Sequence, residues 1–475
     1  MATLKNMTKI VATIGPASAP KEMLKSMILS GMNVCRINFS HGDHPTHQKV
    51  IDTVRELDEE LGTHTAILGD LQGPKIRIGE VENNSVELID GAELVITTKE
   101  RIGTAKEIYI TYSQFPKDVA AGENILIDDG KLMLQVLETN REDEVKCKVL
   151  HGGTLSSKKG VNLPNTKISL PCLTEKDLKD LDFALKNDLS WIALSFVRKA
   201  ADVRELRDII DKKGDKNRII SKVEKPEAID NLDEIIAETD AVMVARGDLG
   251  VEIPMQNVPL VQKEIVRKCQ RLAKPVIIAT QMMESMIENI SPTRAEVNDV
   301  ANAVMDGADA VMLSGETSVG RFPLQVIEAM YKILIRTETF GGIYHKEFMP
   351  ETSDKRFISD SVCYSAVKMQ ERTKAKAIIT MTHSGYTAFK ISSFRPAANV
   401  YVFTGNKKIL TMLSLLWGVK GFYYDRFVST DQTIEDIKTT LKENQLVQPE
   451  DLIINVASMP IKEKGMTNMV RLSHA

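Results

Sequence analysis

The chain has 475 residues, of which 43% are hydrophobic, and this length allows two to four domains with a sizeable core. Its 61 basic and 65 acidic residues leave a net charge of −4, so no global positive field favours nucleic acid as a partner. There is no apolar run of about 18 residues for a membrane span and no signal-peptide layout, and five cysteines without a C-x-x-C pair favour a reduced, cytoplasmic protein.

Eight short apolar runs recur along the chain, and stretches with helical spacing lie between most of them. Runs that are apolar on both faces suit parallel strands covered by helices. Their starts are 23 to 35 residues apart except for one interval of 126, which joins this range if residues 74–171 are an insertion. The repeat predicts a (β/α)8 TIM barrel, with a doubly wound sheet as the alternative. The predicted strands are 9–15, 34–40, 65–71, 191–197, 218–224, 241–248, 275–281 and 310–316.

The inserted segment differs in pattern from the rest of the chain. In "SVELIDGAELVITT" and "NILIDDGKLMLQVLET" apolar and polar residues alternate between turns, which predicts antiparallel strands in a small β-barrel. Gly73-Pro74 and "LPNTKISLPC" are proline-containing hinges on its two sides, so we expect a lid. After residue 345 strands and helices alternate again, as in an open-sheet α/β domain. The expected domains are a catalytic barrel (1–73 and 172–345), a lid (74–171) and a C-terminal regulatory or oligomerisation domain (346–475).

Polar residues gather where the predicted barrel strands end, which is where barrel enzymes carry their chemistry. Any one of them is ordinary, but so many charges converging on one face need partners or ligands. These residues are Arg36, Asn38, Ser40, Asp70, Lys222, Glu224, Arg246, Gly247, Asp248, Thr280, Ser314 and Glu316.

The charges at the strand ends suit a doubly anionic substrate. Glu224 and Asp248 are hard oxygen ligands for a substrate-bridging Mg²⁺. Lys222 and Arg36 suit a phosphoryl group in transfer, and amides at the turn of Gly247 can point at a carboxylate. The sequence has no GxxxxGK[ST] or GxGxxG signature, so a nucleotide would bind by another geometry.

Several motifs, in order along nearly the whole chain, resemble the pyruvate kinase family. They are "RINFSHG", "GPKIRIG", "SSKKGVNLP", "ISKVE", "VMVARGDLGVEIP", "IIATQMMESM", "PTRAEVNDVANAVMDGADAVMLSGET" and "GMTNMVRL". The resemblance implies transfer of the phosphoryl group of phosphoenolpyruvate to ADP, giving pyruvate and ATP in glycolysis, with Mg²⁺ or Mn²⁺ as the metal. It also implies a cytoplasmic homotetramer.

The resemblance assigns roles residue by residue. Arg36 would hold the phosphate region, and Lys222 would stabilise the phosphoryl group in flight and the developing enolate. Glu224 and Asp248 would bind the divalent ion. The carboxylate would be held by the amides of Gly247 and Asp248 and the hydroxyl of Thr280, which also joins the proton-delivery path. The residues that would face the nucleotide phosphates are Asn38, Ser40, His41, Arg77 and Lys159.

The hinge stretch "GDLQGPKIRIG" departs from the better-known family pattern. In many members the counterparts of Asn38, Ser40, Asp70 and the Leu71 carbonyl ligate an activating K⁺. Those members carry a glutamate where this chain has Lys75, so the chain resembles the K⁺-independent branch. A tethered ammonium can supply the charge otherwise recruited from solution. Lys75 is therefore interpreted as a built-in cation, and a solvated hinge lysine is the alternative.

The stretch "TMTHSGYTAFKIS" in the third domain runs from a strand into a helix. Hydroxyls and free amides there can form an anion pocket, and the corresponding family loop holds the phosphate of an allosteric activator. The loop before "GMTN" is short, so a phosphorylated sugar or AMP is as plausible as fructose bisphosphate. A capped helix without a ligand is the alternative. The residues concerned are Thr382, Ser384, Gly385 and Thr387.

Two other functions fit parts of the pattern. A Mg²⁺-dependent lyase or aldolase would share Glu224 and Asp248 but needs neither the lid nor Lys159. A catalytically inactive relative would not need the complete set of strand-end residues. His41, His44 and His47 have an H-x2-H-x2-H spacing, but Pro45 interrupts the turn, so a helix start is favoured over a zinc site.

Overall fold

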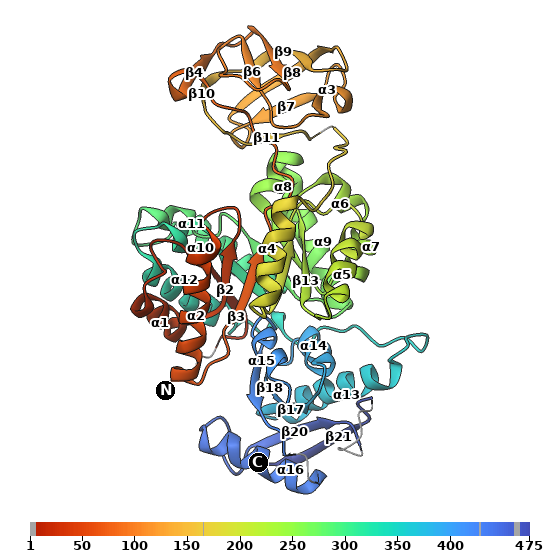
Figure 1. Ribbon diagram of the computed structural model, residues 1–475. Coiled ribbons are helices and arrows are strands. Elements are labelled where there is room, and N and C mark those ends of the chain that lie inside the picture. Colours follow the sequence, from red (N-terminus) through yellow and green to blue (C-terminus); the bar gives the residue numbers. More distant parts are fainter. Residues whose placement is uncertain (1–5, 165, 427–428, 460–465) are drawn as a thin grey trace.

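Three bodies follow one another along the long axis of the molecule in the computed structural model, which describes residues 6–164, 166–426, 429–459 and 466–475 (Figure 1). A small β-rich body lies at one end, a barrel surrounded by helices lies in the middle, and an α/β body lies at the other end. No helix among the described residues is long and apolar enough to cross a membrane.

Eight parallel strands close the central barrel in the order β1-β16-β15-β14-β13-β12-β3-β2. The predicted TIM barrel is therefore confirmed, and the doubly wound sheet is excluded. The strands are β1 (Lys9–Thr13), β2 (Met32–Asn38), β3 (Ala66–Asp70), β12 (Trp191–Leu194), β13 (Arg218–Val223), β14 (Ala241–Ala245), β15 (Val276–Ala279) and β16 (Ala310–Leu313).

Helices cover the outside of the barrel, and sequence signals set several of their ends. Thr174 with Asp177, and Thr293 with Glu296, form capping boxes at the starts of α4 and α10. Gly62 ends α2 in the left-handed conformation that glycine adopts without strain. The helices are α1 (Lys21–Ser30), α2 (His44–Leu61), α4 (Glu175–Lys186), α5 (Ala200–Lys212), α6 (Pro226–Asp230), α7 (Leu232–Glu238), α8 (Arg246–Glu252), α9 (Val258–Arg271), α10 (Arg294–Asp306), α11 (Gly315–Ser318) and α12 (Pro323–Thr337).

The chain leaves the barrel after β3 and returns before α4, and the segment between them folds around its own apolar core. Its described strands form a six-stranded sheet, β11-β7-β8-β9-β5-β6, and a two-stranded ribbon, β10-β4. Its elements are β4 (Ser85–Leu88), β5 (Glu93–Thr97), β6 (Glu107–Tyr109), α3 (Phe115–Asp118), β7 (Asn124–Ile127), β8 (Leu132–Thr139), β9 (Glu144–His151), β10 (Gly153–Ser156) and β11 (Val161–Asn162).

The C-terminal body is an open five-stranded sheet in the order β19-β18-β17-β20-β21, with β21 antiparallel. Its elements are α13 (Phe357–Thr373), β17 (Ala377–Met381), α14 (Tyr386–Ser393), β18 (Asn399–Thr404), α15 (Lys407–Leu413), β19 (Val419–Tyr423), α16 (Thr430–Glu443), β20 (Leu452–Ala457) and β21 (Met469–His474). Trp191 joins this domain to the barrel, since its indole nitrogen donates to the Met412 carbonyl at 3.3 Å. The apolar cluster inside the barrel is therefore continuous with the core of the C-terminal domain.

Candidate active site

Lys222 lies at the centre of the polar residues at the barrel mouth. Its Nζ is 2.9 Å from Glu224 Oε1 and 3.3 Å from Asp70 Oδ1, and it donates to Ser195 Oγ at 2.7 Å. Burial disfavours the charged amine, but Asp70 and Glu224 outweigh this effect and raise the pKa of Lys222 above its ordinary value. The ammonium is therefore charged and fixed in position at neutral pH.

Arg36 is the second cation of this cluster. Its Nε and Nη2 lie 2.8 and 2.7 Å from Asp70 Oδ2, and its Nη1 donates to Thr13 Oγ1 at 2.8 Å. Asp70 is fully buried, which disfavours its charge, but Lys222 and Arg36 hold its pKa below the ordinary value. One carboxylate thus pairs with both cations and holds them side by side at the barrel mouth.

Glu224 and Asp248 follow the adjacent strands β13 and β14. Burial and the charge of Asp248 raise the pKa of Glu224, although Lys222 opposes this. Since the two carboxylates repel each other, a divalent cation between them would relieve the repulsion. Among the described residues no three His, Cys, Asp or Glu side chains form a metal cluster, so substrate and water would supply the remaining ligands. This donor set fits Mg²⁺, which keeps several waters and needs one or two carboxylates.

Gly247 and Thr280 lie together beside Asp248. The Gly247 amide donates to Thr280 Oγ1 at 2.7 Å, and that hydroxyl donates to the Ala279 carbonyl at 2.6 Å. Thr280 has a φ of 68°, an uncommon conformation for a β-branched residue. Arg246 holds this strained turn, because its Nη2 donates to the Thr280 carbonyl at 2.9 Å while two nitrogens bind Asp299 at 2.7 Å.

The loop after β2 brings Asn38, Ser40 and His41 to the same mouth. Asn38 Oδ1 accepts from the Ser40 amide at 3.1 Å, and the His41 amide donates to the Asn38 carbonyl at 3.2 Å. Partial burial, followed by the charges of Arg77, Lys75 and Arg36, lowers the pKa of His41. The imidazole is therefore neutral at pH 7 and free to exchange hydrogen bonds with a ligand.

Arg77 and Lys159, the two cations of the inserted domain that we expect to face the nucleotide, have their partners within that domain. Arg77 Nη1 donates to the Lys158 carbonyl at 2.9 Å, and Lys159 Nζ lies 2.9 Å from Asp128 Oδ1. Each of the two cations therefore already has an oxygen partner inside the inserted domain.

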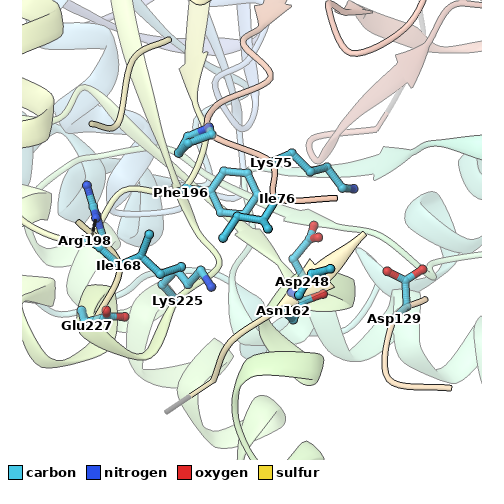
Figure 2. Close-up of a pocket in the computed structure, with 12 residues that line it drawn as sticks. Lys75, Ile76, Asp129, Asn162, Ile168, Phe196, Arg198, Lys225, Glu227 and Asp248 are labelled. Atoms are coloured by element: carbon cyan, nitrogen blue, oxygen red, sulfur yellow. Dashed lines mark hydrogen bonds between the residues drawn. The ribbon is translucent and has the colours of Figure 1, made fainter. Parts of the chain in front are cut away.

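Lys75 lies in the cleft between the inserted domain and the barrel, beside Asp129, Asn162 and Asp248 (Figure 2). Its side chain is exposed and makes no ion pair within the described part of the chain. Asp70 is paired with Arg36 and Lys222, and the Leu71 carbonyl accepts from Ser195 Oγ at 2.7 Å. Asp70 and the Leu71 carbonyl, two groups of the predicted cation site, therefore have partners other than Lys75.

The loop before α14 uses its polar groups internally. Thr382 Oγ1 accepts from the Gly385 amide at 3.0 Å, and Ser384 Oγ accepts from the Tyr386 amide at 3.5 Å. Thr387 is buried against Thr467, with their hydroxyls 2.8 Å apart. Residues 460–464 and Gly465 of "GMTN" lie outside the described residues.

His44 and Glu316, two residues singled out from the sequence, have structural partners instead of ligands. His44 Nε2 is 2.7 Å from Asp180 Oδ1, and its ring stacks on Phe183, so it is not part of a three-histidine site. Glu316 accepts from the Ser314 amide at 2.7 Å and the Met283 amide at 3.2 Å, and burial raises its pKa. It holds a loop beside the mouth.

Ser195 is a functional candidate that the sequence analysis missed. It follows directly after β12, is 1% exposed and lies between Lys222 Nζ and the Leu71 carbonyl. Its position directly after the apolar run "WIAL", at the carboxyl end of a barrel strand, is the signal that could have identified it.

Comparisons with known proteins identify the same family in two long segments of the chain. The family described as "Pyruvate kinase, barrel domain" matches residues 5–327, and "Pyruvate kinase, alpha/beta domain" matches 360–473. Pyruvate kinase from Staphylococcus saprophyticus is 43% identical over 98% of this chain and 80% of its own length. Pyruvate kinase from Corynebacterium efficiens is 43% identical over 99% and 98%. A crystal structure of a pyruvate kinase from Cryptosporidium parvum superposes with a TM-score of 0.92 at 38% identity, over 99% of this chain and 96% of that chain.

Proposed function

The chain belongs to the pyruvate kinase family and transfers the phosphoryl group of phosphoenolpyruvate to ADP, and from this premise we propose that the cluster around Lys222 is its catalytic centre. The observation that carries the proposal is the convergence of Lys222, Arg36, Asp70 and Glu224 from three strands within ion-pair distance. We place the domain limits at residues 73/74, 171/172 and 345/346.

Lys222 and Arg36 act by charge and position. Phosphoryl transfer passes through a state whose charge is spread over the equatorial oxygens, so fixed cations stabilise it without reorganisation. Lys222 also faces the enolate oxygen that develops as the phosphoryl group leaves. Arg36 orients the phosphate, and Asp70 keeps both cations in place.

Glu224 and Asp248 would hold the divalent ion, and pyruvate kinases generally use Mg²⁺ together with K⁺. When bound, the ion supplies positive charge between the carboxylates and the substrate oxygens. The amides of Gly247 and Asp248 and the hydroxyl of Thr280 would bind the substrate carboxylate, with Thr280 also on the proton path. ATP and ADP phosphates would contact the residues of the β2 loop and the lid, namely Asn38, Ser40, His41, Arg77 and Lys159.

Lys222→Met tests the catalytic assignment. We expect turnover to fall by about 10²- to 10³-fold because one preorganised cation is lost, while phosphoenolpyruvate binding remains. A coupled assay of pyruvate formation gives the rate, and equilibrium dialysis gives the binding. Lys167→Met, at an exposed lysine outside the cluster, is the control. Turnover near that of the native protein in Lys222→Met would refute the role.

The enzyme is proposed to need no K⁺, because Lys75 supplies a cation beside the Asn38, Ser40, Asp70 and Leu71 region. The lowered pKa of His41 on the β2 loop supports this, because Lys75 contributes to it together with burial and the charges of Arg77 and Arg36. We expect equal turnover with and without K⁺ and Na⁺, and a weaker, K⁺-dependent Lys75→Glu variant. Activation of the native enzyme by K⁺ of more than about tenfold would contradict the proposal.

The remaining assignments concern assembly, location and regulation. We propose a cytoplasmic homotetramer whose loop at Thr382, Ser384, Gly385 and Thr387 binds a phosphorylated effector. The position of this loop directly before α14 supports the effector site, because the N-cap residue Gly385 has no side chain that could cap the helix. Sugar phosphates and AMP should shift the substrate saturation curve. A curve unchanged at saturating concentrations of both would refute the effector, and sedimentation measures the oligomer.

A further inference from the structure

Glu252 joins three segments of the chain at the edge of the active site. It is the last residue of α8, and its Oε1 accepts two hydrogen bonds. One comes from Lys225 Nζ at 2.6 Å, and the other comes from Asn162 Nδ2 at 2.8 Å. Asn162 belongs to β11 of the inserted domain, whereas Lys225 follows β13 of the barrel. The mechanism above uses none of these three side chains.

The Lys225–Glu252 pair connects the backbone segments that carry the two proposed metal ligands. Lys225 directly follows Glu224 in the sequence. Glu252 lies four residues after Asp248 on α8, so the two carboxylates lie on the same side of that helix. The ion pair therefore links the two segments beyond the ends of the paired strands β13 and β14.

This ion pair is shielded from water. Lys225 is 7% exposed and Glu252 is 5% exposed. Removing one partner of a buried ion pair destabilises the protein, because the remaining buried charge is left without a counter-charge. Replacing either side chain is therefore expected to shift α8 relative to β13.

Asn162 brings the inserted domain into the same cluster. It lines the cleft between the two bodies together with Lys225 and Asp248 (Figure 2). The second carboxylate oxygen of Glu252 is buried and accepts no hydrogen bond within the described residues. The lid is therefore held to the barrel here through one oxygen atom, and a second donor could be accepted as the lid moves.

We propose that Glu252 is a positioning residue that couples docking of the inserted domain to the divalent-metal site. With Lys225 it fixes the separation of Glu224 and Asp248, and with Asn162 it holds the lid against that pair. This inference rests on the proposed function through its metal ligands. Since coupling between two binding events is reciprocal, metal binding should also favour the docked lid.

Metal binding tests the barrel half of the cluster. Mn²⁺ binding to the full chain is titrated by electron paramagnetic resonance without nucleotide. We expect the dissociation constant to rise by at least about fivefold in Lys225→Met, the lower range for coupled sites. The control Lys212→Met, at an exposed lysine of α5, and Lys225→Arg, which keeps the ion pair, should stay within about twofold of the native value. Equal affinity in Lys225→Met and Lys212→Met overturns the proposal.

The position of the inserted domain tests the other half. Nitroxide labels at Glu142→Cys and Lys212→Cys, both exposed, report the lid–barrel distance by double electron–electron resonance, and the five native cysteines are buried. In Asn162→Asp the new carboxylate repels Glu252, so the distances should lengthen. Mn²⁺ should narrow the distribution in the native background and fail to do so in Asn162→Asp. Identical distributions in both backgrounds overturn the coupling.

Two further variants separate this proposal from the metal assignment. Glu224→Gln and Asp248→Asn should each weaken Mn²⁺ binding more than Lys225→Met does, because they remove ligands. If both bind Mn²⁺ as the native chain does, the metal assignment fails. The lengthening of the lid–barrel distance in metal-free Asn162→Asp then still decides whether Glu252 holds the lid.

Discussion

Lys222 and its partners form a rigid electrostatic unit at the scale of single residues. The ammonium has three oxygen partners within 3.3 Å, so its position is fixed before substrate arrives. Asp70 pairs with Arg36 as well as with Lys222, so one carboxylate holds both cations in place. Preorganised charges of this kind stabilise a transition state without paying for reorientation during the reaction.

Ser195 is the partner whose role is easiest to isolate, since it carries no charge. We predict that Ser195→Ala lowers kcat by about tenfold and leaves KM for phosphoenolpyruvate nearly unchanged. A hydrogen bond to a charged group contributes roughly 1.5 kcal/mol, and its loss lets the ammonium move away from the reacting oxygen. Steady-state kinetics with the coupled assay measure both constants.

Ser190→Ala is a matched control for this prediction. Ser190 precedes the same strand, β12, at its other end and shares a hydrogen bond with Thr411 of the C-terminal domain at 2.9 Å. This variant should keep the native kcat. A kcat for Ser195→Ala equal to that of Ser190→Ala would show that Ser195 does not position Lys222.

At the scale of secondary-structure elements, Asp177 connects the two chain segments that form the lid hinge. Its Oδ1 accepts from the Gly73 amide at 3.0 Å, while Oδ2 accepts from the amide and hydroxyl of Thr174 at 2.9 and 2.6 Å. One buried carboxylate therefore ties the outgoing chain after β3 to the start of α4, where the chain has returned. Gly73 tolerates no side chain there, because a Cβ would lie 2.7 Å from the Phe196 ring and its φ is 70°.

We predict that Asp177→Ala lowers the free energy of unfolding by about 2 to 4 kcal/mol, since a helix cap is lost and buried donors are left without acceptors. Denaturant titration measures this change. Hydrogen exchange at the Gly73 amide should also accelerate.

Thr293→Ala removes the N-cap hydroxyl from the capping box of α10, which has no hinge contact. It should cost about 1 kcal/mol and leave exchange at Gly73 unchanged. Equal losses in the two variants would mean that Asp177 acts as a helix cap alone.

The elements were predictable from the sequence because their apolar periodicity is local. Runs such as 218–224 and 241–248 contain the observed strands β13 and β14, and strand polarity alone places Lys222 and Asp248 at one mouth. The partners of these side chains were not predictable. Lys159 binds Asp128, and Thr280 adopts a positive φ, because tertiary contacts determine both. Lys75 shows the same limit, since its direction depends on how the lid is docked.

The barrel and the C-terminal domain form one continuous core at the scale of the whole molecule. Arg218, the first residue of β13, lies over the Phe389 ring at 4.7 Å, and its Nη2 donates to the Ser384 carbonyl at 3.5 Å. The strand that carries Lys222 at its far end therefore begins against the proposed effector loop. Changes in that loop have a direct structural path to the barrel.

Lys9 is a buried charge at the same interface. It lies at the start of β1, is 7% exposed, and its Nζ donates to the Val419 carbonyl at 2.9 Å. Burial lowers the pKa of Lys9 from 10.5 to about 8, with Glu338 and Asp309 opposing this and Lys420 adding to it. The buried charge of this amine therefore lowers the free energy of unfolding at neutral pH.

This cost predicts how stability changes with pH. Below pH 8 Lys9 is protonated in both the folded and the unfolded chain. Between about pH 8 and 10.5 the unfolded chain keeps this proton while the folded chain loses it. The free energy of unfolding therefore rises with pH in that window. Compared with Lys9→Met, in which this group is absent, the native protein should gain up to about 3 kcal/mol across the window, at 1.36 kcal/mol per pKa unit. Denaturant titrations of both proteins from pH 7 to 10.5 measure the difference. Lys212→Met, at an exposed lysine, should track the native curve. A constant difference between native and Lys9→Met would mean that the amine titrates alike in the folded and unfolded states.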